Sequence, residues 1–104
     1  GMNAYYAGKH WALRKKDAEL WHWLTLAAMN AQGIRRTPFK LPVAVTFYWN
    51  DRLDIDNHAI MGKMIVDAMK GRVIEDDNRR WLKSVSHNFH DEDYIQVEIR
   101  EVRP

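Results

Sequence analysis

The clearest structural signal in the chain is the run VAVTFYW from Val43 to Trp49. β-Branched and aromatic side chains favour the extended backbone of a sheet, so this run is the strongest predicted strand. A polar turn follows at residues 50–52, and a helical spacing of apolar residues then runs from Asp56 or Asn57 to Met69. Gly71 stands where this helix would end. The side chains predicted on its buried side are Ile60, Met61, Met64, Ile65 and Ala68.

An earlier helix is predicted over residues 17–32. Asp17 is suited to cap its start, and Gly33 stands where it would end. Its apolar residues recur at intervals of three and four, at Leu20, Trp23, Leu24, Ala27, Ala28 and Ala31. The stretch 2–13 has no clear period and reads as an extended lead-in, whereas residues 35–42, with two prolines, read as a loop.

Two further strands are predicted at residues 82–88 and 94–102. The second alternates apolar and polar side chains, and the polar loop at residues 90–93 favours an antiparallel hairpin between the two strands. The predicted fold is α+β, with two helices packed on a mixed β-sheet of three to four strands. It forms one small domain over residues 1–104, in which Gly1, ahead of Met2, is typical of a residue left by an expression tag.

Composition excludes several classes of protein. The chain has 104 residues, 46% of them hydrophobic and 29% charged, which suits one compact domain. No run approaches the roughly 18 apolar residues of a membrane span. Because there is no cysteine, disulfides, thiolate zinc sites and a cysteine nucleophile are excluded. The start has no basic and apolar leader, so a cytoplasmic location is expected.

Charge is distributed unevenly along the chain. Residues 1–40 carry seven Lys/Arg against two Asp/Glu, whereas residues 41–104 carry nine against twelve. A basic region beside an acidic one is typical of a polyanion-binding protein with a carboxylate site, and equally of ordinary scatter of surface charge.

Two acidic clusters could bind a metal ion. The first is Asp54-Ile55-Asp56-Asn57, and the second is Glu75-Asp76-Asp77. If the first is the end of a strand, its two aspartates project to the same side, and the second cluster could return beside them. Converging carboxylates repel one another unless a cation neutralises them, and ligation by oxygen alone favours Mg²⁺, Mn²⁺ or Ca²⁺. The alternative is that these residues only cap a helix and form turns.

Lys63 and Asp67 lie on the same face of the predicted helix as Asp56. The functional interpretation is a lysine that balances charge at a metal-carboxylate site. The alternative is an ordinary ion pair between residues four apart on a helix.

Several basic clusters could contact phosphates. Any one of them is also typical of a solvated surface. They are Lys9 and His10, Arg14-Lys15-Lys16, Arg35-Arg36 and Arg79-Arg80.

The order of these motifs resembles that of the RusA-type Holliday junction resolvases. The resemblance rests on Asp54-Ile55-Asp56-Asn57, on a helix that carries Lys63 and Asp67, and on Glu75-Asp76-Asp77-Asn78. The opening Asn3-Ala4-Tyr5-Tyr6-Ala7-Gly8-Lys9-His10-Trp11 agrees with it too. The lysine lies seven residues after Asp56, whereas the family pattern has four. The family's opening strand with its proline pair is also missing.

This resemblance implies a homodimeric endodeoxyribonuclease of DNA recombination and repair. It implies cleavage of four-way junctions with Mg²⁺, or Mn²⁺ in its place, bound by Asp54, Asp56 and Asp77, with Lys63 as a further catalytic residue. Secondary candidates are Asn57, Asp67 and Asp76. The candidate DNA contacts are Lys9, His10, Arg14, Lys15, Lys16, Arg79 and Arg80. The alternatives are another metal-dependent nuclease acting on flaps, forks or RNA, and a non-catalytic nucleic-acid-binding protein.

Overall fold

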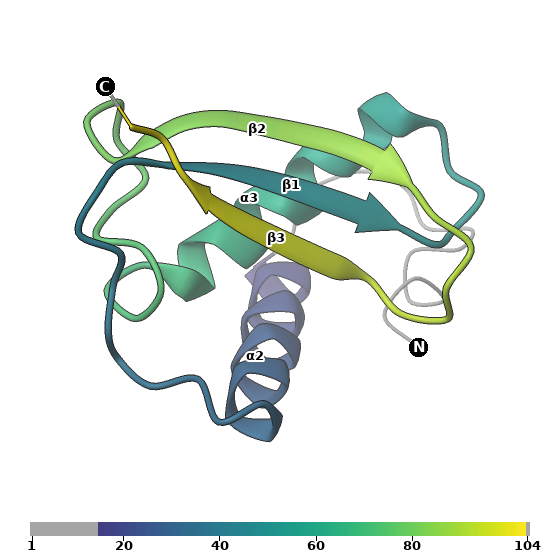
Figure 1. The fold of residues 1–104 in the computed structure, drawn as a ribbon. Helices are drawn as coiled ribbons and strands as arrows, with labels where there is room; N and C mark the ends of the chain where they lie inside the picture. Colours follow the sequence, from purple (N-terminus) through teal and green to yellow (C-terminus); the bar gives the residue numbers. More distant parts are fainter. Residues whose placement is uncertain (1–14, 104) are drawn as a thin grey trace.

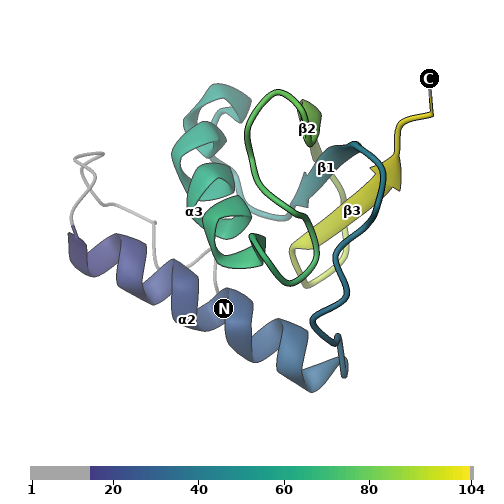
Figure 2. The ribbon, with the colours of Figure 1, turned by 90° about the vertical axis from the view of Figure 1, so that its left-hand side faces the viewer.

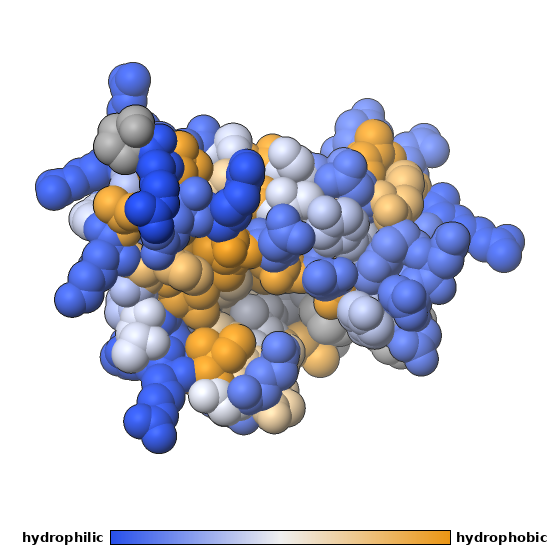
Figure 3. Space-filling view, in the orientation of Figure 1, coloured by the Kyte–Doolittle hydropathy of each residue, from blue (hydrophilic) through white to orange (hydrophobic). Residues whose placement is uncertain are grey.

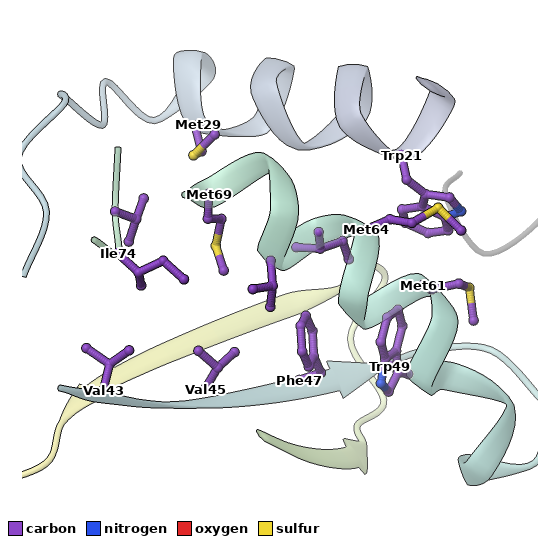
Figure 4. Packing of buried hydrophobic residues seen from close by; sticks show 13 residues of the cluster. Trp21, Met29, Val43, Val45, Phe47, Trp49, Met61, Met64, Met69 and Ile74 are labelled. Carbon is purple, nitrogen blue, oxygen red and sulfur yellow. The ribbon is translucent and has the colours of Figure 1, made fainter. Parts of the chain in front are cut away.

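The computed structural model describes residues 15–103 and places two α-helices on one face of a three-stranded sheet (Figure 1, Figure 2). Helix α3 lies between α2 and the sheet (Figure 4). The elements in chain order are α2 (Lys15–Ala31), β1 (Val43–Trp49), the 3₁₀ turn η1 (Ile55–His58), α3 (Ala59–Met69), β2 (Leu82–Phe89) and β3 (Gln96–Glu101). The predicted α+β class is confirmed. None of the described helices is long and apolar enough to cross a membrane.

The central strand of the sheet is β1, because the strand order is β2-β1-β3. It pairs in parallel with β2, so that Trp49 lies opposite Phe89, and antiparallel with β3, where Val45 lies opposite Ile99. The strand with the most apolar sequence therefore occupies the position with a neighbour on both edges, as is usual for buried strands.

The predicted hairpin between the last two strands is wrong. The strands themselves form close to their predicted bounds, but β2 and β3 lie on opposite edges of β1. The crossover from β1 through α3 to β2 takes one edge of β1, which leaves the other edge for β3. The polar loop after β2 therefore passes the end of β1, where the His90 N–H donates to the Trp49 carbonyl at 3.0 Å.

Helix α2 forms close to the predicted range, and Gly33 follows it with a φ of 68°. Its buried stripe differs from the expected one. The stripe consists of Asp17, Trp21, Thr25 and Met29, whereas Trp23 is 68% exposed. Asp17 is the third residue of the helix, so the predicted cap at this position is wrong. Because α2 packs mainly on α3, a narrow stripe of residues four apart covers the contact, with the Trp21 ring completely buried.

The second predicted helix has a different start. Residues 55–58 form the 3₁₀ turn η1, and the α-helix begins only at Ala59. The helix ends at Met69 as predicted, and Gly71 follows with a φ of 78°. The predicted burial is confirmed for Met61, Met64, Ile65 and Ala68.

The core forms where alternate residues of β1 point toward α3 (Figure 4). The approach is closest at Gly62 of α3. A Cβ atom there would lie 3.0 Å from His87 Cε1 and 3.2 Å from Phe47 Cε2. Phe47 is fully buried and stacks on His87 with 5.2 Å between ring centroids. Phe47 is enclosed by the core and can yield little, whereas His87 is partly exposed, so the close approach of α3 to the sheet favours the absence of a side chain at Gly62.

A groove of about 750 Å³ separates the second half of α2 from β3. Apolar side chains that include Met29, Ile95 and Val97 line it, and Figure 3 shows the surface hollowed there between apolar patches. Along this side, the described residues leave the core partly open.

We expect Gly62→Ala to destabilise the protein by about 1 kcal/mol. Alanine gains up to about 1 kcal/mol of helix propensity, but overpacking of a rigid core costs about 1–3 kcal/mol. Urea denaturation measures the difference. Adding Phe47→Leu to Gly62→Ala should recover part of the loss, because the smaller side chain makes room for the new methyl group. A Gly62→Ala protein more stable than the wild type would contradict the close approach.

Candidate metal centre and nucleic-acid interface

The turn that follows β1 is held together by a buried contact between the Asp51 carboxyl and the His58 ring. His58 Nε2 lies 2.8 Å and 2.9 Å from the two carboxylate oxygens of Asp51, and its Nδ1 donates to the Ile55 carbonyl at 3.0 Å. The His58 side chain is 0% exposed and that of Asp51 is 7% exposed. Asp51 Oδ1 also accepts the Leu53 N–H at 2.9 Å. We name this arrangement the Asp51–His58 clasp.

Asp54 and Asp56 project from this clasped turn into solvent. Asp54 has an extended backbone and caps η1 without a side-chain hydrogen bond, and Asp56 lies inside η1. The predicted strand end is therefore wrong: the backbone turns between the two aspartates, so strand alternation does not orient them. Both are exposed, and neither carboxylate makes a hydrogen bond or ion pair with another residue in the described range 15–103. Asn57 is half-buried and donates its N–H to the Asp54 carbonyl at 3.0 Å.

Asp77 belongs to a second group, the ion cluster of Lys63, Asp67, Lys70 and Asp77. Lys63 Nζ lies 3.4 Å from Asp67 Oδ1 and 3.7 Å from Asp77 Oδ2. Lys70 Nζ lies 3.4 Å from Asp67 Oδ1 and 3.5 Å from Asp77 Oδ1. Two cations therefore stand between two carboxylates, and Lys63 contacts both Asp67, four residues along the helix, and Asp77, from the segment before β2.

The ion cluster shifts the protonation of Asp77. Partial burial by itself would raise the pKa of this carboxyl, but the charge of Lys70, hydrogen bonding with Asp76 and the charge of Lys63 together outweigh it, so the pKa lies below its ordinary value. For Lys70, desolvation would lower the pKa, but hydrogen bonding and attraction to Asp67 and then Asp77 raise it. Each group therefore favours the charged form of the other.

The two acidic groups lie at opposite ends of the sheet. Asp54 and Asp56 follow the end of β1, whereas Asp77 precedes the start of β2, and these strands run in parallel. A strand of seven residues spans about 20 Å. Figure 1 shows η1 beyond the arrowhead of β1, with the segment between α3 and β2 at the other end.

The structure does not bring Asp54, Asp56 and Asp77 together within one chain. Over residues 15–103, no group of three or more His, Cys, Asp or Glu side chains could hold a metal ion. Asp76 has a local role, because its Oδ1 accepts the Asp77 N–H at 2.8 Å and its Oδ2 accepts Asn78 Nδ2 at 3.2 Å. These bonds fix the turn from which the Asp77 carboxylate faces the lysines.

The basic candidates divide by location. Lys9, His10 and Arg14 lie outside the described residues, and Lys15 and Lys16 are the first two residues of α2. Arg79 and Arg80 are exposed in the turn before β2, where the Arg80 guanidinium lies 5.1 Å from the centre of the Trp81 ring. Arg79 and Arg80 thus lie in the same segment before β2 as Asp77 of the ion cluster.

Sequence reasoning missed three residues that shape these groups: Lys70, Asp51 and His58. Lys70 follows Asp67 by three residues and Lys63 by seven, so helical spacing could have placed it on the same face. His58 could have been recognised as part of the buried face of α3, since Met61 and Ile65 follow it by three and seven residues. Asp51 carries no such signal, because only the folded turn brings it to His58.

Comparison of the chain with protein-family models, with curated proteins and with solved structures finds no match. The resemblance to RusA-type resolvases therefore rests on the residue pattern alone. Within residues 15–103, the candidate groups are two exposed carboxylates at one end and a lysine-paired carboxylate at the other.

We expect Lys70→Met to raise the pKa of Asp77 toward its ordinary value of 3.8. Lys63→Met should raise it less, because the attraction of Lys63 is the smaller of the two. A carboxyl with a lowered pKa stabilises the fold above pH 3.8, and this contribution is lost as the pH falls through the folded-state pKa. Lys70→Met should therefore weaken that acid dependence.

Carbon-detected NMR titration of the Asp77 carboxyl measures this pKa directly. Lys83→Met is the matched control, since Lys83 Nζ donates to the Arg79 carbonyl at 2.8 Å and pairs with no described carboxylate. An unchanged Asp77 pKa in Lys70→Met would contradict the ion cluster.

Proposed function

We propose that the protein is a Mg²⁺-dependent endodeoxyribonuclease that resolves four-way DNA junctions by phosphodiester hydrolysis. The observation that carries this proposal is the pair of exposed carboxylates, Asp54 and Asp56, on one clasped turn. Mg²⁺ is commonly bound by one or two carboxylates together with substrate phosphates and water. Two aspartates with no described cation to neutralise them fit this kind of site.

Asp54 and Asp56 would hold the ion, with Mn²⁺ as a chemically similar substitute. When bound, such an ion lowers the pKa of its water and polarises the scissile phosphate. The other residues of the chain supply position and charge. Arg79 and Arg80, exposed ahead of β2, would bind backbone phosphates, and Lys63 and Lys70 would offset the charge of Asp77 and of the phosphates.

A homodimer would bring the third aspartate to this site. A two-fold axis that reverses the direction of the sheet puts the Asp77 end of one copy beside the Asp54–Asp56 end of the other. Charge supports this arrangement, since Arg79, Arg80 and Lys83 lie near the start of β2, whereas acidic residues 91–93 follow its end. Such a dimer would present two equivalent sites to the two equivalent strands of a four-way junction.

The test is incubation of the full chain with a four-way junction, a flap and a nicked duplex, with and without Mg²⁺. Symmetric nicks in the junction that require Mg²⁺ would support the proposal. Cleavage of the flap alone would replace it with the other nuclease function. Binding without cleavage of any substrate would favour the non-catalytic protein, which the absence of a three-carboxylate group in residues 15–103 also suits.

We expect Asp54→Asn, Asp56→Asn and Asp77→Asn each to abolish junction cleavage and leave DNA binding largely intact. An amide keeps the shape of the side chain but loses the charge that attracts the cation. Asp91→Asn is the matched control, because Asp91 is an exposed aspartate in the loop after β2. Wild-type rates in Asp77→Asn would contradict the assignment and direct attention to Asp76.

We also expect two inactive variants to restore activity when mixed. If each site takes Asp54 from one copy and Asp77 from the other, a dimer of Asp54→Asn with Asp77→Asn contains one intact site and one doubly altered site. After free exchange, about a quarter of all sites are then intact. Nicking assays of the equilibrated mixture measure this recovery. If each site came from one chain, every site would carry one substitution and the mixture would stay inactive.

A further inference from the structure

The Asp51–His58 clasp lies directly beneath the carboxylates of the proposed site. It begins three residues before Asp54 and ends two residues after Asp56. The His58 side chain is fully buried, and both of its ring nitrogens face acceptors, the Asp51 carboxylate and the Ile55 carbonyl. The two ring nitrogens therefore join Asp51 to the Ile55 carbonyl, and the clasp closes residues 51–58 into one hydrogen-bonded loop.

The clasp fixes the backbone on both sides of Asp54. Asp51 Oδ1 accepts the N–H of Leu53, the residue before Asp54, at 2.9 Å. His58 Nδ1 donates to the carbonyl of Ile55, the residue between the two aspartates, at 3.0 Å. The two side chains of the clasp thus hold the peptide groups that set the direction of Asp54 and the position of Asp56.

Aromatic packing anchors the clasp to the sheet. The centroid of the His58 ring lies 4.6 Å from that of Trp49, at the end of β1. It lies 5.5 Å from the ring centroid of Phe89, at the end of β2, and these two rings meet edge to face. Trp49 Nε1 in turn donates to Nδ1 of His87 in β2 at 3.0 Å. The turn is therefore held against two neighbouring strands, and the aspartates it carries have a set position relative to the fold.

A buried polar contact is weak support for stability. Taking polar groups out of water costs free energy, and well-packed apolar residues in place of both partners are often neutral or stabilising. Geometry is the better explanation for the pair. Asp54 and Asp56 repel each other, and a flexible turn would let their carboxylates separate when no cation is bound.

We propose that Asp51 and His58 are positioning residues that hold Asp54 and Asp56 in the arrangement that binds the divalent cation, an inference that rests on the proposed function. Groups that orient the ligands of a metal site change metal affinity by about 10- to 100-fold when they are lost. The clasp touches neither the cation nor the substrate, so its effect reaches the site only through the backbone of residues 53–55.

The test separates positioning from folding with two kinds of variant. Asp51→Asn keeps one oxygen acceptor but replaces the other carboxylate oxygen beside His58 Nε2 with an NH2 group, which cannot accept, so the contact with His58 is weakened. The double variant Asp51→Leu with His58→Met keeps the site packed, so it should stay folded although the Leu53 N–H and the Ile55 carbonyl lose their partners. In both, we expect Mn²⁺ affinity, measured by electron paramagnetic resonance without DNA, to fall by about 10- to 100-fold.

The same variants should raise the half-saturating Mg²⁺ concentration for junction cleavage by a similar factor and leave DNA affinity in EDTA unchanged. Val43→Ala is the control, because Val43 is buried at the opposite end of β1 from the clasp. It should lower thermal stability and leave Mn²⁺ affinity as in the wild type.

Unchanged Mn²⁺ affinity in a folded double variant would overturn the positioning role, with the proposed function intact. Loss of Mn²⁺ affinity in Val43→Ala equal to that in Asp51→Asn would also overturn it, since general destabilisation would then explain the effect. A wild-type protein that neither binds Mn²⁺ nor cleaves a junction would overturn the proposed function and the positioning role with it.

Discussion

Because β1 and β2 pair in parallel, the chain has to cross the length of the sheet between them, and α3 forms this crossover. Most other features depend on that arrangement. Because β2 pairs with one edge of β1, β3 can pair only with the other edge. It also separates the turn after β1 from the turn before β2, and with them the two acidic groups of the molecule.

Close packing makes the crossover rigid. At Gly62 the backbone of α3 approaches Phe47 and His87 so closely that even a methyl group would crowd them. One turn earlier, His58 lies between Trp49 and Phe89 and pairs with Asp51. The start of α3 is therefore tied to two strands by apolar and polar contacts together, and the proposed metal site at Asp54 would depend on this rigidity.

The charges of the molecule follow the same division. Asp54 and Asp56 stand exposed at one end, whereas at the other end Lys63 and Lys70 hold the Asp77 carboxylate in its charged form. A polyanion such as DNA would meet repulsion at the first end unless a cation were bound there, and attraction near the second. Separation of this kind within one chain is what gives a second copy a place in the proposed mechanism.

Local sequence was enough to predict the strand at Val43–Trp49 and both helices, because propensity and apolar spacing act over a few residues. It also singled out Asp54, Asp56 and Lys63 as candidates, whose role stays a prediction. It also suggested a mixed sheet. Pairing partners were beyond its reach, since local pattern cannot tell a hairpin from two strands that flank a third. For the same reason the Asp51–His58 clasp, the Lys70–Asp77 contact and the distance between the two acidic groups emerged only in the folded chain. Each joins or separates residues through the crossover, whose geometry depends on how α3 packs against the sheet.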